Sequence, residues 1–328
     1  MPMNAISAAK KRRVFMLLSS RALPYAKLCI RTMLANSDEP IALRLVADDN
    51  QEKSVLQAET AEFSASGENT IEVIAKDEVS DRLTDRFPGL AGLRALHEGH
   101  PCWRKIIDPL VLSEENDEAI VTDPDLFFPN SYTFEATPAE GVMVMRQGPN
   151  CLFPPAAVRE AFELGVRLAN HVDIGVAQLR AGAVDPEWLD WLASGLDLDA
   201  YRPFMHIEAI LWSAMAMRFG GRHLDPKVWR CWERGKFKRL AIAAGLPGRW
   251  TLRLEPLDSV KCIHVSGPSK WWVTEAIAFG ELKEFHNDCR APSVGSAYVE
   301  LTRAEYEREQ RLKTRFEKLG LYRLTRSG

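Results

Sequence analysis

Short apolar runs alternate with amphipathic segments through the first half of the chain. The runs cover residues 14–20, 41–47, 70–75 and 119–128, and each has the length and residue content of a buried strand. Residues 23–35 lie between the first two runs and repeat apolar side chains at helical spacing, with Leu28 and Met33 on one face. Helical patterns also precede the third and fourth runs. We therefore expect strands and helices to alternate.

This alternation is typical of an α/β protein with a mostly parallel, Rossmann-like sheet and helices on both faces. Ligands in such folds bind beyond the carboxyl ends of the strands, where the strand order reverses. The residues that follow the expected strands are polar: Ser19, Ser20, Asp48, Asp49, Asp123 and Asp125. We expect these side chains to converge at one edge of the sheet, as a nucleotide site requires.

The second half of the chain gives a weaker pattern. Residues 141–146, 175–179 and 261–265 have the composition of strands, and residues 207–217 that of a buried helix. No repeat or low-complexity linker marks a domain boundary. From residue 301 onward, apolar side chains recur at helical spacing among many Arg and Lys residues. We therefore expect one α/β domain over residues 1–297, and a basic amphipathic helix over residues 298–328.

Composition and charge narrow the class of protein. The chain has 328 residues, 46% of them hydrophobic, and a net charge of −3, which argues against nucleic acid as a partner. Its six cysteines form no CxxC pair and are expected to be free thiols. The apolar run near the amino terminus is too short for a signal peptide, and no run is long enough to span a bilayer. We expect a cytoplasmic, soluble protein.

The acidic triplet Asp123-Pro124-Asp125 offers the first candidate chemistry. Side chains alternate along a strand, so Asp123 and Asp125 are expected to point the same way. Carboxylates at the end of a buried strand repel each other unless a cation or hydrogen-bond donors compensate. Mg²⁺ and Mn²⁺ prefer carboxylate and phosphate oxygens, which favours a metal–diphosphate site. A solvated Asp-Pro-Asp turn is the structural alternative.

A second candidate lies in CIHVSGPSKWW, where an expected strand runs into a turn. A neutral imidazole at His264 can complete a metal shell. Backbone amides near Gly267 can approach phosphate oxygens, and Lys270 adds a positive charge. The alternative is a histidine packed on a short strand.

The two motifs together resemble family 8 of the retaining glycosyltransferases, which includes glycogenin and bacterial lipooligosaccharide galactosyltransferases. The residues that match are Asp123, Asp125, His264, Gly267, Lys270 and Trp271. The resemblance implies the GT-A fold. It also implies a Mn²⁺ or Mg²⁺ ion held by Asp123, Asp125 and His264, and a nucleotide-sugar donor, most simply a UDP-sugar.

Three further stretches, in the same order as in the family, carry other implied roles. WRKIIDPLVL resembles the helix whose basic residue, here Arg104 or Lys105, meets the donor. HVDIGVAQL resembles an Asn-Ala-Gly strand with Asp173 in the Asn place, and MHIEAILWSAM supplies the carboxylate Glu208. The first-strand turn departs from the family because Ser19 and Ser20 replace the residues that read uracil.

The resemblance implies a retaining, metal-dependent glycosyltransferase with a glycan or glycolipid acceptor, such as a bacterial surface glycan. Donor-binding residues would be Ser19, Ser20, Arg104, Lys105, Gly267, Lys270 and Trp271. Asp173 and Glu208 would be the catalytic carboxylates that stabilise an oxocarbenium-like sugar. One alternative is a non-catalytic nucleotide-sugar-binding relative. A sugar nucleotidyltransferase is the other, although the first-strand turn lacks the glycine-rich loop that holds a triphosphate.

Two other features have more than one interpretation. His97 and His100 in HEGH have a spacing that can bind metal, but the motif lacks the HExxH pattern, and loop or packing roles are equally simple. The tract over residues 226–239 interleaves tryptophans with basic residues. The expected terminal helix likewise combines apolar and basic residues. Both segments suit peripheral contact with a membrane, or a solvated basic face.

Overall fold

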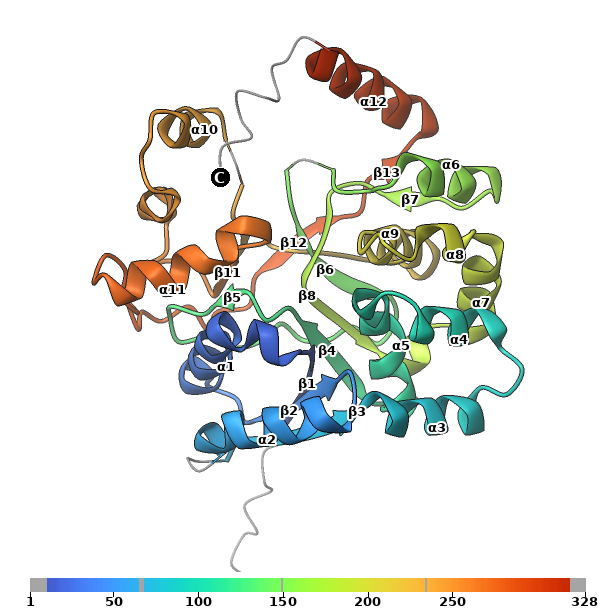
Figure 1. Cartoon of the computed structure of the whole chain (residues 1–328), viewed down its shortest axis with the longest axis horizontal. Coiled ribbons are helices and arrows are strands. Elements are labelled where there is room, and N and C mark those ends of the chain that lie inside the picture. Colours follow the sequence, from blue (N-terminus) through green and yellow to red (C-terminus); the bar gives the residue numbers. More distant parts are fainter. Residues whose placement is uncertain (1–10, 65–67, 149, 234, 319–328) are drawn as a thin grey trace, which may run out of the picture.

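Two small sheets accompany one large, mostly parallel sheet in the computed structural model, which describes residues 11–64, 68–148, 150–233 and 235–318 (Figure 1). The large sheet has the order β12 (Val294–Ala297), β9 (Gly221–Leu224), β6 (Val142–Arg146), β8 (Val172–Arg180), β4 (Glu118–Thr122), β1 (Arg12–Leu17), β2 (Ile41–Ala47), β3 (Thr70–Ala75). Only β8 and β12 run against the other strands of this sheet. The sequence prediction of a mostly parallel sheet is confirmed.

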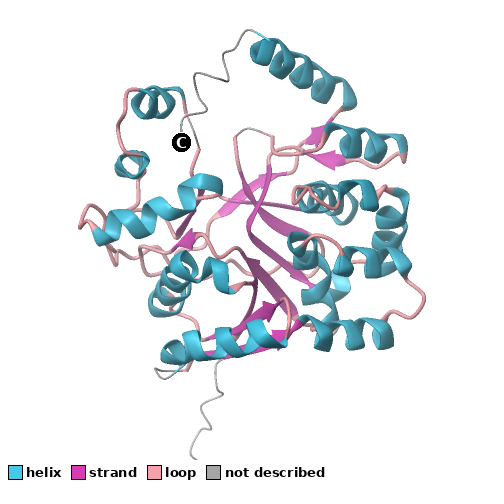
Figure 2. Cartoon of the chain, viewed as in Figure 1, coloured by secondary structure: helices cyan, strands magenta, loops and turns pink. Residues whose placement is uncertain are grey.

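Helices lie on both sides of the large sheet (Figure 2). The helices of the described residues are α1 (Leu23–Asn36), α2 (Asn50–Ser64), α3 (Lys76–Arg86), α4 (Ala91–Glu98), α5 (Arg104–Val111), α6 (Pro155–Glu163), α7 (Pro186–Gly195), α8 (Leu198–Tyr201), α9 (Ile207–Phe219), α10 (Lys236–Ala243), α11 (Lys270–Ala278) and α12 (Arg303–Lys318), of which α10 and α12 lie apart from the large sheet (Figure 1). Short 3-10 turns add η1 (Ser20–Ala22), η2 (Pro101–Trp103), η3 (Ala181–Ala183), η4 (Gly248–Leu254) and η5 (Gly267–Ser269).

Alternating side chains of the central strands feed two separate cores. In β1, Val14 and Met16 pack with the apolar face of α1, whereas Phe15 packs with α5 on the opposite side. This is the period-two pattern of a strand that is covered on both faces. The same arrangement explains why these strands read as continuous apolar runs in the sequence.

The predicted strand over residues 119–128 is wrong beyond Thr122. The chain leaves the large sheet there, turns through Asp123-Pro124-Asp125, and enters β5 (Leu126–Phe127). This strand pairs with β11 (Cys262–His264), which also pairs with β10 (Trp229–Cys231). Two carboxylates and a proline without an N–H group interrupt the ladder. The triplet therefore lies at the junction between two sheets.

The last described segment packs against the main body. Its strand β13 (Glu300–Leu301) pairs with β7 (Leu168–Ala169), and α12 follows with Tyr306 buried. The helix is also tied to α6, since Arg159 Nε lies 2.7 Å from Glu307 Oε1. The domain boundary expected after residue 297 stays a prediction. Part of the predicted terminal helix, residues 319–328, lies outside the described residues.

Candidate active site

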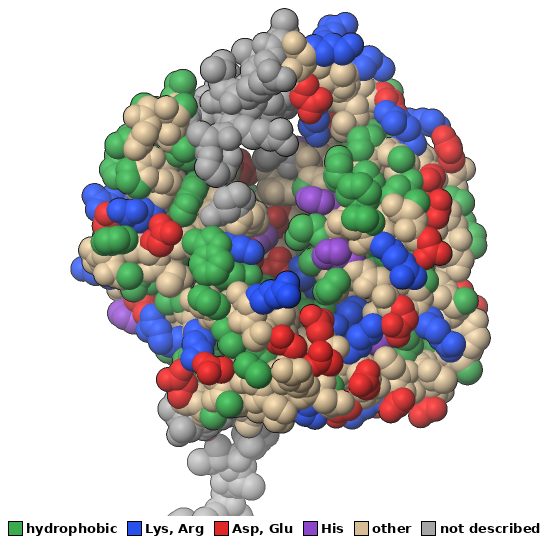
Figure 3. Space-filling view, in the orientation of Figure 1, with side chains coloured by type: hydrophobic (Ala, Val, Ile, Leu, Met, Phe, Trp, Pro, Cys, Tyr) green, Lys and Arg blue, Asp and Glu red, His purple; other side chains and the backbone are tan. Residues whose placement is uncertain are grey.

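A cleft of about 770 Å³ opens where β1, β2 and β4 end, and the space-filling view shows a hollow on this face (Figure 3). The residues of the triplet and of the predicted donor site that line it are Ser19, Lys105, Asp123, Asp125, Asp173, Glu208, His264, Gly267 and Lys270. The polar strand ends thus meet at one edge, as expected of parallel strands. Residues distant in sequence complete the opposite wall.

The predicted metal ligands come together at the base of the cleft. Asp123, Asp125 and His264 each contribute one possible ligand atom, and these three atoms lie within 4.8 Å of one another. His264 Nε2 lies 3.2 Å from Asp125 Oδ1 and 3.6 Å from Asp123 Oδ2. Two carboxylates and an imidazole form an O,O,N set that suits Mn²⁺ or Mg²⁺.

The charges of this cluster are incompletely satisfied. Asp125 Oδ1 and His264 Nε2 are buried, face each other, and make no hydrogen bond of good geometry. Burial alone would lower the pKa of His264, but the charges of Asp173 and Asp125 outweigh it and hold that pKa well above its usual value. Burial raises the pKa of Asp123. A divalent cation would satisfy these atoms together, so the residues present fit the ion.

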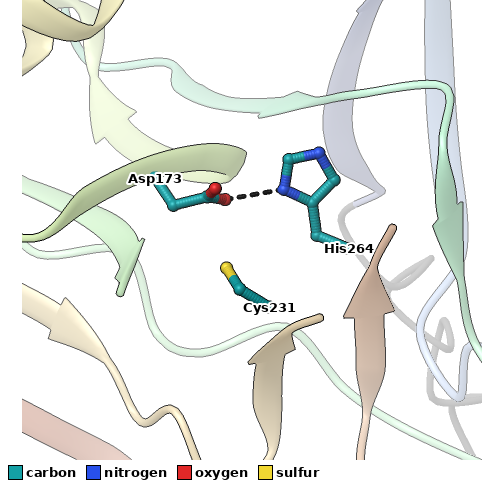
Figure 4. A group of neighbouring side chains, drawn as sticks. All are labelled: Asp173, Cys231 and His264. Carbon is teal, nitrogen blue, oxygen red and sulfur yellow. Dashed lines mark hydrogen bonds and ion pairs between the residues drawn. The ribbon is translucent and has the colours of Figure 1, made fainter. Parts of the chain in front are cut away.

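Asp173 contacts His264. Its Oδ1 lies 2.8 Å from His264 Nδ1 (Figure 4). The same oxygen accepts a hydrogen bond from Gly175 N at 2.9 Å. Burial opposes ionisation of Asp173, but the charge of His264 and its hydrogen bond prevail and lower the Asp173 pKa. With Nδ1 engaged, Nε2 is the ring nitrogen that faces the carboxylates. A Cβ atom at Gly175 would lie 2.7 Å from the His264 ring, which explains the glycine.

Lys105 balances the remaining acidic charge. Its ammonium pairs with Asp123 Oδ1 and lies 3.1 Å from Glu208 Oε1. Burial opposes the charge of Lys105, yet Asp123 and Glu208 raise its pKa well above the usual value. Burial raises the pKa of Glu208 to about 8, although Lys105 opposes this shift. Lys105 therefore enters from α5 and bridges the triplet to Glu208 at the start of α9.

The turn after β11 contributes a second cation. Gly267 has a φ of +65°, a left-handed conformation that favours glycine, and starts η5. Lys270 Nζ lies 3.4 Å from Tyr25 Oη and 4.9 Å from the centre of the Tyr25 ring. Tyr25 in turn packs edge-on against Trp271 at 5.0 Å between ring centres. Burial, together with Asp125 and Asp123, raises the pKa of Tyr25 to about 12.

Three predicted donor residues are not among those that line the cleft: Ser20, Arg104 and Trp271. Ser20 donates from its backbone N–H to Glu52 at 2.6 Å, and from its hydroxyl at 2.8 Å. Arg104 is buried and pairs with Asp48 and Asp108. Trp271 is exposed and packs edge-on against Tyr25.

Sequence reasoning missed several residues of this wall. Tyr25, Gln147 and Cys151 line the cleft but belong to no motif, and Met205 and His206 line it from the stretch MHIEAILWSAM without an assigned role. Tyr25 lies in the helical segment 23–35, and its spacing there gives no sign of a cleft. The others lie in loops and at a helix start, brought in by contacts between distant segments.

The histidines of HEGH take other roles. Neither His97 nor His100 belongs to a metal-ligand group among the described residues. His97 is buried, with Nδ1 2.8 Å from Asp108 Oδ1 and Nε2 2.8 Å from Ser80 Oγ. His100 caps η2 by accepting from Cys102 N at 3.1 Å. The six cysteines are free, as predicted.

Solved glycosyltransferase structures are similar to this chain, although no protein-family model and no curated protein matches it. Ligand-free mouse xyloside xylosyltransferase 1 shares 13% identity with a TM-score of 0.49, over 79% of this chain and 99% of that one. Galactosyltransferase LgtC, in complex with donor and acceptor sugar analogues, shares 10% identity with a TM-score of 0.45, over 81% and 94%. The glycosyltransferase GlyE of Streptococcus pneumoniae TIGR4 shares 11% identity with a TM-score of 0.43, over 84% and 61%.

Proposed function

We propose that this protein is a metal-dependent glycosyltransferase that transfers a sugar from a nucleotide-diphosphate sugar to a glycan or glycolipid acceptor. The convergence of Asp123, Asp125 and His264 at the base of the cleft carries the proposal. Their unpartnered buried atoms call for a cation, and the adjacent cleft has the volume of a small-molecule site. The resemblance to family 8 names the nucleotide sugar, with UDP as the expected nucleotide.

The bound cation would stabilise the negative charge that grows on the departing diphosphate. Lys105 and Lys270 line the same cleft and add positive charge from two sides. Lys105 also keeps Asp123 paired before a ligand arrives. Asp173 and Glu208 are the remaining carboxylates. Since Asp173 is engaged with His264, we assign it the role of a positioning residue and retain Glu208 as the candidate that faces the sugar.

The test combines metal binding with turnover. Wild-type protein is expected to bind Mn²⁺ in a calorimetric titration and to hydrolyse UDP-glucose or UDP-galactose slowly in its presence. Asp125→Ala should abolish both while retaining a cooperative unfolding transition. Asp288→Asn, on the exposed surface, should change neither. Turnover of Asp125→Ala at the wild-type rate with Mn²⁺ would refute the metal assignment.

A non-catalytic nucleotide-sugar-binding protein is a second candidate. The engagement of Asp173 with His264 favours it, because one of the two expected catalytic carboxylates is already paired with an imidazole. The two functions differ in turnover. Stoichiometric binding of UDP-glucose or UDP-galactose with Mn²⁺, without release of free sugar or transfer to glycan acceptors, would favour the binding protein.

We also propose that the protein makes peripheral contact with an anionic membrane. Among the described residues, none of the helices has both the length and the apolar content needed to cross a bilayer. On α10, however, Phe237 and Leu240 are 64% and 70% exposed, and on α12 Leu312 and Phe316 are 45% exposed beside basic residues. Co-sedimentation with phosphatidylglycerol vesicles at low salt, lost at high salt, is expected. Binding to the vesicles that is equal at low and high salt, or no binding at all, would contradict the membrane proposal.

A further inference from the structure

Among the described residues, His264 belongs to two groups of possible metal ligands. The first is the set with Asp123 and Asp125 that lies at the base of the cleft. The second joins His264 to Asp173 and Cys231, whose ligand atoms also lie within 4.8 Å of one another (Figure 4). Each side chain of this second group is more than nine-tenths buried, and Asp173 and His264 line the cleft. An ion that enters the cleft is therefore adjacent to this group.

The register of the three-stranded sheet brings Cys231 next to His264. The strands β10 and β11 are parallel, and Cys231 is the direct partner of His264 in their pairing. Side chains of paired residues in neighbouring strands point to the same face of a sheet. Trp232 N donates to His264 O at 2.8 Å immediately after this pair, which fixes the register at its end. Asp173 comes from β8 of the large sheet and completes the group.

The second group differs from the first in the softness of its donor atoms. A cysteine sulfur, an imidazole nitrogen and a carboxylate oxygen form an S,N,O set that suits Zn²⁺, whereas Mn²⁺ and Mg²⁺ prefer oxygen. Bonds of about 2.0 to 2.3 Å place the ligand atoms of a tetrahedral Zn²⁺ about 3.3 to 3.8 Å apart. The 2.8 Å contact between Asp173 Oδ1 and His264 Nδ1 would therefore open by about 0.5 Å on binding. Such a shift needs only small side-chain movements.

The two groups use opposite nitrogens of the His264 ring. Nε2 faces Asp123 and Asp125, whereas Nδ1 contacts Asp173. A neutral imidazole has a proton on one nitrogen and a lone pair on the other, so it holds one ion at a time. Zn²⁺ at Nδ1 displaces the thiol proton of Cys231 to solvent and leaves the single ring proton on Nε2. The first group then lacks its nitrogen ligand.

We propose that Asp173, Cys231 and His264 form a Zn²⁺ site, and that Zn²⁺ bound there excludes the Mn²⁺ or Mg²⁺ ion of the proposed active site. The exclusion rests on the proposed function, since it assumes a hard cation on Asp123 and Asp125. The Zn²⁺ site itself depends only on its own three residues. Zn²⁺ is then an inhibitor of metal-dependent turnover that acts by binding the shared histidine from its other side.

Co²⁺ is the probe that locates the ion, because a thiolate bound to Co²⁺ gives a charge-transfer band in the near ultraviolet. The band is measured in Asp125→Ala, which removes a ligand of the first group only. Co²⁺ should produce it there, and Zn²⁺ should bleach it by displacement. Adding Cys231→Ala, or the nearly isosteric Cys231→Ser, should abolish the band and weaken Zn²⁺ affinity by at least about 100-fold, since a direct ligand is lost.

Cys262→Ala in the same background is the matched control. Cys262 is a buried thiol on β11 and belongs to no metal-ligand group of the described residues, so this variant should keep the band and the Zn²⁺ affinity. Co²⁺ binding without a thiolate band in Asp125→Ala would overturn the site. A band that persists in both Cys231 variants would also overturn it, because another thiol would then be the ligand.

The exclusion is measured on wild-type protein loaded with Mn²⁺. Free Mn²⁺ gives a sharp electron paramagnetic resonance signal that is lost on binding, so titration with Co²⁺ should restore this signal in step with the growth of the thiolate band. A band that forms while Mn²⁺ stays bound would overturn the exclusion. Release of Mn²⁺ without the band would place Co²⁺ on the first group and overturn it as well.

The outcomes separate this inference from the proposed function. If wild-type protein does not bind Mn²⁺ but the thiolate band forms in Asp125→Ala, the proposed function fails, the exclusion fails with it, and the Zn²⁺ site stands. If Mn²⁺ binds and supports hydrolysis of UDP-glucose or UDP-galactose but no band forms, the Zn²⁺ site is overturned and the proposed function stands.

Discussion

A different carboxylate lies near each ring nitrogen of His264, and the hydrogen bond is made at Nδ1. Asp173 engages Nδ1 at 2.8 Å, while Nε2 faces Asp125 at 3.2 Å. A carboxylate behind a metal-binding histidine fixes the ring and increases its basicity. Asp173 stands where the family that the sequence resembles has asparagine, so it would lie behind the proposed cation, and its added charge would act through the histidine.

Asp173→Asn tests this role. The amide oxygen can still accept from Nδ1, but its lack of charge should weaken Mn²⁺ binding by about 10- to 100-fold. Titration calorimetry measures the change, with the conservative replacement Asp173→Glu expected to recover part of it. Wild-type affinity in Asp173→Asn would show that the carboxylate has only a packing role.

Lys105 has an electrostatic role that can be measured in the absence of metal. Lys105→Met leaves Asp123 and Glu208 buried without their shared cation, so the free energy of unfolding should fall by about 3 kcal/mol. Urea denaturation in chelator gives this value. Lys270→Met is the matched control, because the ammonium of Lys270 contacts Tyr25 and Trp271 and no carboxylate of the described residues, so stability should change by less than about 0.5 kcal/mol. Equal losses in both variants would contradict the assignment.

At the scale of elements, the periodicity of apolar residues predicted the helices and strands whose bounds depend on local sequence. The bounds of β2, β3 and α1 agree with the prediction to within a residue or two. The prediction failed at β5, whose partner β11 lies far along the chain and could not be inferred from local pattern. The candidate metal ligands could be named from the sequence because two short motifs resemble a known family, and their binding of an ion stays a prediction. The motif WRKIIDPLVL offered Arg104 or Lys105 for the donor; both side chains are buried, and Lys105 is the one of the two that lines the cleft, which is a tertiary property.

Helix α7 offers a test of element stability. Asp185 accepts hydrogen bonds from Glu187 N and Trp188 N at 3.0 and 3.1 Å, which caps the helix start. Asp185→Ala should lower the free energy of unfolding by about 1 kcal/mol, as seen when such caps are removed. Asp185→Asn should retain most of it, since asparagine caps equally well. Urea denaturation compares the variants, and equal stability of Asp185→Ala and wild type would argue against the cap.

At the scale of the whole molecule, a buried titratable side chain makes the free energy of unfolding depend on pH. His223 of β9 is buried, with Nδ1 unpartnered and its ring edge-on to Tyr298 at 4.8 Å. Burial lowers the pKa of His223 to about 4, and Arg146 and His171 act in the same direction. The folded protein therefore binds a proton at this site less readily than the unfolded chain does.

The sign of the effect follows from this difference. Above the unfolded histidine pKa of about 6.5, both states are neutral and the full stability is present. As pH falls from there towards 4, the unfolded chain takes up the proton first, so stability is lost, by at most about 2 kcal/mol after solvent screening. His223→Gln should remove this part of the pH dependence in urea denaturation at pH 7, 5.5 and 4.5. An identical pH profile in the variant would contradict the shift.

At the acidic triplet, the chain passes from the large sheet to the three-stranded sheet of β5, β10 and β11. Its carboxylates follow β4 of the large sheet, while His264 ends β11 of the small sheet. An ion held by both would act as a removable cross-link between two separately built parts of the molecule. Chelation should then accelerate amide hydrogen exchange in β5, β10 and β11 more than in β1 and β2. The ion that binds the diphosphate of the donor would then also stabilise the junction between the two sheets.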